Sequence, residues 1–376
     1  MIEGIVWASL ISGSAAVGVA IKQFLFARKW FRPSPVDKIT TSETDLPSVT
    51  VCVPARNEAH ALSDCLETVL SSDYPKLEII VLDDSSVDDT SNLIKSFAHS
   101  GVRFVAGSAL PSGWFGKNYA LEGLMKEASG AIILYIDVDT RLRTNTISDL
   151  VSYMMQEKAS MVSVVPRRED GWRFSVVFSP LRYFWELMFH YRGSPAVSGS
   201  AWLIRRKALK DYGGFTFLKD IVAPEASLAS YFAHRHGYRF LVSSPELGIS
   251  YEKKWSSQLA TSIRLLYPTL GNQWTMVIVA VLGLLLILAP FVVVATMNIF
   301  SYSVGIIITA LLLTIAMMTL YTLYAQMVWR SGWWLAPIIA PLIIVQEIAL
   351  VIVSSVQYSR GRVTWKGRPL RSEAQS

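Results

Sequence analysis

Apolar and polar residues divide the chain into an apolar start, a mixed central part and a long apolar end. In the central part, short apolar runs alternate with segments whose apolar residues recur every three or four positions. Such runs are typical of buried strands, and the three-and-four spacing is typical of helices with one buried face. Strand alternating with helix predicts an α/β fold with a mostly parallel sheet. The expected strands cover 49–54, 77–82, 102–105, 132–136, 161–166 and 197–204, and the expected helices include 62–70, 93–97, 120–125 and 221–229.

The two apolar ends are long enough to cross a membrane. Residues 5–25 form one such segment, which we interpret as an uncleaved anchor because no basic residues precede it. Basic residues and Trp30 follow it within residues 28–32, as expected on the cytoplasmic side. Near the other end, 259–267 is amphipathic and predicts an interfacial helix. Three further spans are expected over 275–297, 304–328 and 333–356. Glu347 falls inside the last of these and should face protein or water.

These observations divide the chain into six parts. We expect an anchor (1–32), a linker (33–46), the α/β domain (47–255), an interfacial helix (256–273), about three membrane helices (274–358) and a basic tail (359–376). The charge of the tail predicts a cytoplasmic location, but three spans would carry it to the opposite face. A re-entrant segment, a helix split at Pro337 and Pro341, or a failure of the charge rule would each remove the conflict.

Composition supports a membrane protein. Of 376 residues, 52% are hydrophobic and 17% charged, against roughly 45–50% and about 25% in soluble domains. The net charge of +6 comes largely from basic residues beside the apolar ends, which indicates membrane orientation and contact with anionic lipid. No aromatic-basic module suggests a nucleic-acid partner. Cys52 and Cys65 fit buried positions, and they suggest neither a disulfide framework nor a zinc site.

The strongest chemical signal is the acidic pair Asp137 and Asp139 after the buried strand 132–136. The carboxyl end of such a strand is where an open α/β sheet places its ligand. Two carboxylates this close repel each other unless a positive group lies between them. A divalent cation that also binds a phosphate of the substrate would meet this need. The alternative is an ordinary polar turn.

Two earlier strands also end in polar loops. Arg56, Asn57 and Glu58 follow the first strand, and Asp84 follows the second. Carboxylates there can accept hydrogen bonds from a ribose or a base N–H, although such residues also cap helices. No GxGxxG follows the first strand, which argues against a dinucleotide dehydrogenase. Further on, the segment 113–117 places glycines and aromatic residues before Lys117, which suits close approach to a phosphate; a surface turn is the alternative.

Together these motifs resemble glycosyltransferase family 2, whose members have the GT-A fold. The resemblance rests on Pro54-Ala55-Arg56-Asn57-Glu58, Asp83-Asp84-Ser85, Gly113-Trp114-Phe115-Gly116-Lys117 and Asp137-Val138-Asp139, and it covers about residues 45–265. The membrane layout and Trp365-Lys366-Gly367-Arg368 look like the carotenoid- and hopanoid-associated branch, near the ceramide glucosyltransferases. The resemblance implies inverting sugar transfer from a nucleotide-diphosphate sugar.

The same resemblance implies roles for individual residues. Glu58 and Asp84 would hold the ribose and base, and Asp137 and Asp139 would bind Mg²⁺ or Mn²⁺, with Asp139 the more direct ligand. Glu225 occupies the position of the catalytic base, although Pro224 replaces the acidic residue usual before it. The remaining donor contacts would come from Pro54, Ala55, Arg56, Trp114 and Lys117. Arg264, the one residue retained from a Gln-x-x-Arg-Trp motif, would contact the product diphosphate.

We therefore expect a multi-pass enzyme of the cell membrane with its α/β domain in the cytoplasm. The donor would be a nucleotide-diphosphate sugar, most simply a UDP-sugar, and the acceptor a lipid hydroxyl. One alternative is a polyprenyl-phosphate sugar synthase, for which Arg205 and Arg206 are candidate phosphate-binding residues. Another is a degenerate domain that serves as a membrane scaffold, since Pro224 and the incomplete Arg264 motif depart from the family pattern.

Overall fold

The computed structural model describes residues 2–30, 46–169, 174–188, 190 and 193–370. Its contacts divide the chain into two compact units. We call residues 1–29, 168–190 and 253–363 the membrane unit, and residues 30–167, 191–252 and 364 onward the sheet unit. Compared with the boundaries expected from composition, the aromatic segment 168–190 groups with the membrane helices and the basic tail groups with the sheet. Arg32 and the predicted linker, apart from its last residue, lie outside the described part.

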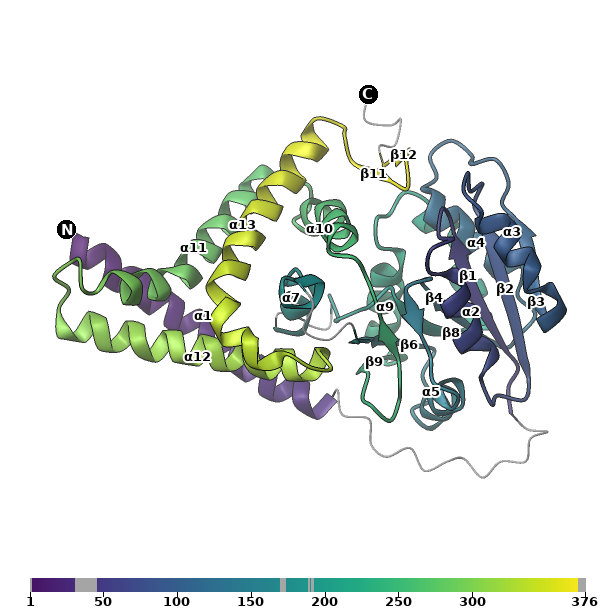
Figure 1. Cartoon of the computed structure of the whole chain (residues 1–376), viewed down its shortest axis with the longest axis horizontal. Helices are drawn as coiled ribbons and strands as arrows, with labels where there is room; N and C mark the ends of the chain where they lie inside the picture. The colour runs from purple at the N-terminus through teal and green to yellow at the C-terminus, as the bar shows by residue number, and fades with distance from the viewer. Residues whose placement is uncertain (1, 31–45, 170–173, 189, 191–192, 371–376) are drawn as a thin grey trace. The chain divides into compact units, whose positions relative to one another are not determined.

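A seven-stranded sheet forms the centre of the sheet unit, in the order β3–β2–β1–β4–β8–β6–β9 (Figure 1). β1 pairs in parallel with β2 and β4, and β2 pairs in parallel with β3. β8 runs antiparallel to both β4 and β6, and β6 is parallel to β9. The expected α/β fold with a mostly parallel sheet is confirmed. The strands are β1 (Val49–Ala55), β2 (Leu77–Asp83), β3 (Val102–Ala106), β4 (Ile132–Ile136), β6 (Met161–Val165), β8 (Ala201–Arg205) and β9 (Tyr238–Val242).

Helices cover the sheet because its strands are apolar on both faces, as expected of buried parallel strands. Alternate residues of β1, including Val51, pack into a hydrophobic cluster with α2 and α5. The residues between them, such as Cys52, face α4, whose Leu124 carbonyl accepts the thiol hydrogen. The helices of this unit are α2 (Leu62–Leu70), α3 (Thr90–Ser96), η2 (Ala98–Ser100), α4 (Gly116–Glu127), α5 (Thr146–Gln156), α8 (Arg206–Tyr212), η3 (Thr216–Leu218) and α9 (Pro224–His234).

Strand direction decides which loops share an edge of the sheet. Because β1, β2 and β4 are parallel, the loops that follow them meet at one edge, which we call the acidic edge. β8 runs the other way, so its last residue, Arg205, pairs with Ile132 at the start of β4. The Arg205-Arg206 pair therefore lies at the opposite edge from Asp137 and Asp139. A small second sheet contains β5 (Thr140–Arg141), β7 (Arg167–Arg168) and β10 (Ser250–Tyr251).

The membrane unit is helical. Four of its helices are long and apolar enough to cross a membrane, over Glu3–Leu25, Trp274–Thr296, Val304–Val328 and Trp333–Ser359. All four were expected from the apolar pattern. The elements of this unit are α1 (Ile2–Trp30), α6 (Phe174–Val177), α7 (Arg182–Met188), α10 (Trp255–Thr269), α11 (Trp274–Thr296), α12 (Val304–Val328), η4 (Trp333–Leu335) and α13 (Ala336–Ser359).

The last apolar helix, α13, returns to the beginning of α11 (Figure 1). It starts shortly after α12 ends, and Pro341 lies inside it without interrupting it. Its far end is bonded to the elements that lead into α11. The Oγ of Ser354 accepts the N–H of Tyr267 at 3.0 Å, and the Oγ of Ser359 accepts the indole N–H of Trp274 at 3.2 Å. The split at Pro337 and Pro341 that the sequence left open is therefore wrong.

After α13 the chain forms a short hairpin that belongs to the sheet unit. β11 (Thr364–Trp365) and β12 (Arg368–Pro369) are antiparallel, with Lys366 and Gly367 between them. Both turn residues have positive φ, 47° and 83°. This is the signature of a type I′ turn, in which glycine is favoured at the second position. We call residues 364–369 the tail hairpin.

Candidate active site

The loops after β1 and β2 are bonded to each other along the acidic edge. The N–H of Asn57 donates to the Ser86 Oγ, and the Asn57 Oδ1 accepts the N–H of Val87, each at 2.9 Å. Asn57 has a φ of 54°, a left-handed conformation that asparagine adopts more readily than most residues. The next residue, Glu58, donates its N–H to the Thr90 Oγ1 at 2.9 Å. The two loops therefore hold their carboxylates in a fixed arrangement.

The carboxylates of these loops are paired with the tail hairpin. The Nζ of Lys366 lies 2.9 Å from the Glu58 Oε1. The Nη1 of Arg368 donates to both carboxylate oxygens of Asp84, at 2.8 and 2.7 Å. Only 3% of the Asp84 side chain is exposed. Burial raises the pKa of both Glu58 and Asp84, while the hydrogen bonds from Lys366 and Arg368 oppose that rise.

The start of α4 brings the segment 113–117 against the same carboxylates. A Cβ on Gly116 would lie 2.9 Å from the Arg368 Nη1 and 3.1 Å from the Asp84 Oδ2, so a side chain at this position would displace the pair. The next residue, Lys117, donates from its Nζ to the Asp137 Oδ1 at 2.8 Å. α4 therefore connects the loop after β2 with the acidic pair after β4.

The acidic pair itself lies at the end of β4. Asp137 and Asp139 are half-buried and Val138 between them is buried. The three residues lie in a turn that is closed by the N–H of Thr140, which donates to the Asp137 carbonyl at 2.9 Å. The charge of Asp139 contributes to the raised pKa of Glu58, which shows that the loops after β1 and β4 face one region. Within the described residues, no group of three or more His, Cys, Asp and Glu side chains could hold a metal ion. Two carboxylates still fit Mg²⁺ or Mn²⁺, because such ions commonly take the rest of their ligands from phosphates and water.

Glu225 stands in the first turn of α9. Pro224 occupies the first turn of the helix, and a carboxylate there is favoured by the helix dipole. The Glu225 carboxylate lies over Gly199, where an added Cβ would be 2.4 Å from its Oε1. The adjacent Ser200 carbonyl accepts the N–H of Asp137 at 3.0 Å. Glu225 is thus beside the segment that supports the acidic pair.

The loop that leads to Glu225 is bonded to α4. The side-chain amide of Asn118 donates to the carbonyls of Leu218 and Ile221 at 2.5 and 2.8 Å. The N–H of Phe115 donates to the Lys219 carbonyl at 2.7 Å. One short helix start therefore positions both Lys117 and the approach to Glu225. Trp114, in the same segment, is half-buried with its ring 5.4 Å from that of Tyr119, edge to face.

The other residues assigned to the donor site have mixed positions. Pro54 is half-buried, whereas the Ala55 side chain is buried in the core below the edge. The Ala55 carbonyl accepts the N–H of Asp84, so this residue shapes the loop through its backbone. The Arg56 guanidinium donates to the carbonyls of Asp84 and Lys366, which ties it to the tail hairpin. Arg264 lies on α10 of the membrane unit, and its contact with a diphosphate stays a prediction.

Lys366 and Arg368 were not among the residues assigned to the site from sequence. The tail was interpreted only as a basic, cytoplasmic segment that carries part of a family resemblance. One signal was available: two basic residues flank a lysine–glycine turn, and two carboxylates elsewhere had no assigned cation. Nothing in the local pattern indicates which carboxylates they meet, because Asp84 and Arg368 are 284 residues apart.

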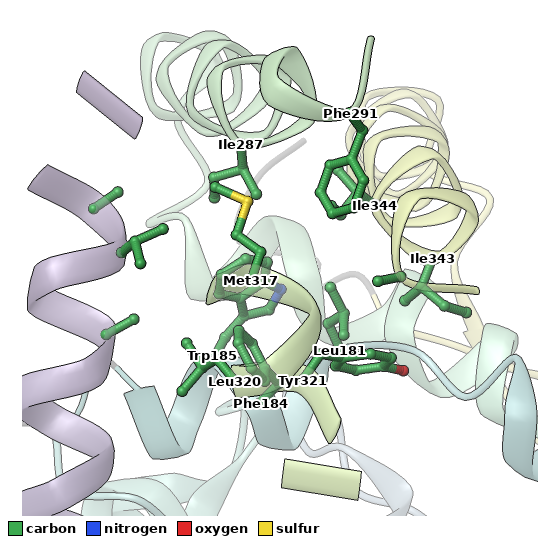
Figure 2. Close-up of a pocket in the computed structure, with 14 residues that line it drawn as sticks. Leu181, Phe184, Trp185, Ile287, Phe291, Met317, Leu320, Tyr321, Ile343 and Ile344 are labelled. Carbon is green, nitrogen blue, oxygen red and sulfur yellow. The ribbon is translucent and has the colours of Figure 1, made fainter. Parts of the chain in front are cut away.

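The membrane unit contains an apolar pocket (Figure 2). It encloses about 590 Å³ of empty space, part of which is open to the outside. Figure 2 shows Met317 between Ile287 and Trp185, with Phe291 and Ile343 on the far walls. The pocket is lined by Ala16, Val17 and Ala20 of α1, Leu181, Phe184 and Trp185 of the α7 region, Ile287 and Phe291 of α11, Met317, Leu320 and Tyr321 of α12, and Ala340, Ile343 and Ile344 of α13.

Glu347 holds one wall of this pocket in place. Its carboxylate accepts the N–H of Leu181 and the indole N–H of Trp185, each at 3.2 Å. The residue is 1% exposed. The expectation that this carboxylate would face protein is confirmed. These hydrogen bonds join α13 to the α7 region. The aromatic segment 174–188 therefore packs as part of the membrane unit.

Comparison with known proteins agrees with this geometry. Residues 50–213 match the model of a family described as Glycosyl transferase family 2. A curated relative, the 4,4'-diaponeurosporenoate glycosyltransferase of Staphylococcus aureus strain bovine RF122 / ET3-1, is 29% identical over 139 residues, which cover 35% of this chain and 36% of the relative. The protein of the same description from strain USA300 is 28% identical with the same coverage. The match thus spans just over a third of these relatives' length.

A solved structure resembles nearly the whole chain. The mannosyltransferase PcManGT from Pyrobaculum calidifontis, in complex with GDP-Man and Mn²⁺, has a TM-score of 0.58 and 21% identity. The alignment covers 94% of this chain and 98% of that one. At this identity the likeness concerns the fold. The sheet unit has a GT-A-like fold. Residues 50–213, somewhat less than half of the chain, are similar to glycosyltransferase family 2.

Proposed function

We propose that this protein is a membrane-bound, inverting glycosyltransferase that transfers a sugar from a nucleotide-diphosphate sugar to a hydroxyl group of a lipid. The observation that carries the proposal is the acidic edge, where four carboxylates follow parallel strands and Lys117 pairs with Asp137. The four are Glu58, Asp84, Asp137 and Asp139. Open α/β sheets bind ligands at such an edge. The similarity of residues 50–213 to glycosyltransferase family 2 favours a nucleotide sugar as that ligand.

Donor binding would use the edge from end to end. Glu58 and Asp84 would accept hydrogen bonds from the ribose hydroxyls and the base, and Arg56 and Trp114 would flank the nucleotide. Lys117, half-buried beside Asp137, would contact the diphosphate as a point charge. The solved structural neighbour binds GDP-Man, whereas the sequence resemblance favours a UDP-sugar. Binding of each nucleotide would decide between them.

Sugar transfer would need a positive charge near the departing diphosphate and a base near the attacking hydroxyl group. Asp137 and Asp139 would hold Mg²⁺ or Mn²⁺, which when bound would neutralise charge that develops on the diphosphate leaving group. Glu225 would accept the proton of the acceptor hydroxyl as it attacks the anomeric carbon from the opposite face. A single displacement of this kind inverts the anomeric configuration. The position of Glu225 beside the support of the acidic pair favours this role.

A lipid acceptor is favoured by the membrane unit. The pocket lined by α1, α7, α11, α12 and α13 has almost wholly apolar walls, so it suits a hydrocarbon chain. The curated relatives are named for diaponeurosporenoate, a carotenoid carboxylate whose long apolar chain also suits such a pocket. We propose that the acceptor's apolar part occupies this pocket and that its hydroxyl group is glycosylated.

The helix contacts suggest a resolution of the topology conflict. If α11 and α12 each cross the bilayer, the end of α12 and the start of α11 lie on one side. α13 begins near the end of α12, and its last turns are bonded to Tyr267, shortly before α11, and to Trp274 at the start of α11. Both ends of α13 therefore lie on that same side. We propose that α1, α11 and α12 cross the cell membrane and that α13 does not. The tail then stays in the cytoplasm with the sheet unit, as its positive charge predicts.

The two alternatives are less favoured. A polyprenyl-phosphate sugar synthase needs a phosphate acceptor site, but Arg205 and Arg206 lie at the opposite edge of the sheet from the acidic pair. Arg205 donates to the Ala159 carbonyl and Arg206 to the Ala128 carbonyl. A degenerate scaffold would have no reason to keep Lys117 paired with Asp137 beside a held Glu225.

Lipid analysis after incubation with labelled nucleotide sugars tests the proposal. Purified full-length protein in lipid nanodiscs should form a labelled glycolipid, with transfer lost on chelation and restored by Mn²⁺ or Mg²⁺. Asp139→Ala and Glu225→Gln should each reduce transfer by at least about 100-fold while the protein stays folded. Asp64→Asn, at an exposed carboxylate 70% open to solvent, is the matched control. Full activity of Asp139→Ala would exclude the metal role, and no transfer by the unaltered protein would exclude the enzyme.

A further inference from the structure

The tail hairpin lies against the residues that are proposed to bind the donor's nucleoside. Its two basic side chains reach two loops that are far away in sequence, with Lys366 on Glu58 and Arg368 on Asp84. In a third contact the hairpin is the acceptor: the Lys366 carbonyl accepts the Nε–H of Arg56 at 3.2 Å. The hairpin is therefore held by its backbone as well as by its charges.

The site is shaped to receive this hairpin. Gly116 has no side chain at the point where the Trp365 ring and the Arg368 guanidinium approach, and a Cβ there would lie 3.1 Å from the ring. Lys366 also donates from its Nζ to the Asn57 carbonyl at 3.3 Å. The type I′ turn at Lys366 and Gly367 points both basic side chains at one surface. These contacts come from three loops of the sheet unit, unlike those of a charged tail lying on a surface.

Charge explains why the hairpin would be needed. Four carboxylates gather along the acidic edge, and the donor to be bound is itself an anion. Lys117 compensates Asp137, but the described residues offer Glu58 and Asp84 no cationic side-chain ion-pair partners other than Lys366, Arg368 and the half-exposed His60. A carboxylate as buried as Asp84 is costly unless it is paired. The hairpin adds two positive charges to this edge, which reduces its repulsion of a nucleoside diphosphate.

After pairing with the hairpin, these carboxylates can still accept further hydrogen bonds. Each carboxylate oxygen can accept two hydrogen bonds, and Arg368 uses one on each oxygen of Asp84. Asp84 therefore keeps unused lone pairs, with its position set by the guanidinium. Because only 3% of its side chain is exposed, a base N–H would reach it after a shift of the side chains around it. The pairing is therefore compatible with a bound nucleotide.

We propose that the tail hairpin forms part of the donor site, with Arg368 and Lys366 as positioning residues that hold Asp84 and Glu58 for a nucleoside diphosphate. The proposal rests on the proposed function for the identity of the ligand class only. It differs from the opposite possibility, in which the hairpin blocks the site and must leave before the donor enters.

Nucleotide binding to the full-length protein tests this inference separately from sugar transfer. The dissociation constants of UDP and GDP would be measured calorimetrically in the presence of Mn²⁺ for the unaltered protein, Arg368→Ala, Arg368→Lys and Arg362→Ala. Arg362 is exposed and lies in the same tail outside the hairpin, so it is the matched control. Arg368→Ala should weaken binding by at least about tenfold, Arg368→Lys should restore part of the loss, and Arg362→Ala should change nothing.

A double-mutant cycle with Asp84→Asn identifies positioning. If Arg368 acts through Asp84, Arg368→Ala should weaken binding far less in the Asp84→Asn background than alone. In turnover, Arg368→Ala should raise KM for the donor about tenfold while kcat stays within about threefold. Unchanged or tighter nucleotide binding by Arg368→Ala, with an unchanged melting temperature, would overturn the inference. Tighter binding would show that the hairpin blocks the donor site. Nucleotide binding without sugar transfer would overturn the proposed function and leave this inference intact.

Discussion

The Nζ of Lys117 lies 2.8 Å from the Oδ1 of Asp137, and this pair joins the start of α4 to the end of β4. Asp137 therefore has a cation beside it. Under the proposed function, Asp139 would be the more direct ligand of a divalent ion. Lys117 is then available to share its charge between Asp137 and a phosphate.

Replacing Lys117 should therefore separate metal binding from catalysis. Lys117→Met removes the charge near the diphosphate, and we expect kcat/KM to fall by about 10²–10³-fold. Mn²⁺ should bind at least as tightly as before, because Asp137 loses its competing cation. Steady-state transfer and calorimetric Mn²⁺ titration measure the two effects. Lys126→Met, on the exposed face of the same helix where Lys126 pairs with Glu122, should alter neither. Weaker Mn²⁺ binding by Lys117→Met would contradict this division of tasks.

The pH dependence of donor binding should reveal the partner of Asp84. Burial raises the pKa of Asp84, as does Asp83, whereas Arg368 and Arg56 lower it. Removing Arg368 takes away the main lowering influence, so the pKa of Asp84 should rise further. The ionised carboxylate accepts a base N–H more strongly than the protonated one, so binding should weaken at a higher pH as the solution is acidified. The pH below which 1/KM for the donor falls should be higher in Arg368→Ala than in the unaltered protein, and it should not change in Arg362→Ala. A downward shift would contradict the assignment.

Membrane topology can be tested with single cysteines. Cys52 and Cys65 are buried, so they should react little in folded protein. We expect Ser301→Cys, between α11 and α12, to be labelled from outside intact cells by a membrane-impermeant maleimide. Arg362→Cys, just after α13, should be labelled only after permeabilisation. Labelling of both from outside would show that α13 crosses the membrane after all.

The apolar pocket offers a test of the acceptor site. Met317→Trp should fill it, so transfer to lipid should fall by at least about tenfold while nucleotide binding is unchanged. Ile315→Trp places the same side chain on α12 at a position that is 59% exposed, and it should be close to neutral. Glycolipid formation and calorimetric UDP binding are the two measurements. Equal transfer by the two variants would exclude this pocket as the lipid site.

Local patterns predicted much of the fold. Apolar runs placed β1, β2, β4 and β6 within a residue or two, because each is buried on both faces. The loops after three of these strands could be assigned to one edge because parallel strands share a direction. The position of Glu225 beside Gly199 could not be predicted in this way, because it depends on how α9 packs.

Long-range pairing limited the rest of the prediction. The contact between Asp84 and Arg368 joins residues 284 positions apart, and no local pattern encodes such a partner. The return of α13 to the start of α11 depends on hydrogen bonds from single residues such as Ser354 and Ser359. Hydropathy detects only that α13 is apolar. For the same reason, the sequence indicated that segment 174–188 is aromatic, but it did not predict the hydrogen bonds from Leu181 and Trp185 to Glu347.

The tail hairpin also sets an order of events during biosynthesis. Residues 364–369 leave the ribosome after α1, α11, α12 and α13, so Asp84 and Glu58 cannot meet their cations until every apolar helix has been made. A nascent chain that has folded only the earlier parts of the sheet unit, up to residue 252, still lacks these two pairs. Competence to bind a sugar nucleotide would therefore follow membrane insertion, which keeps an uninserted enzyme from holding the donor away from lipid.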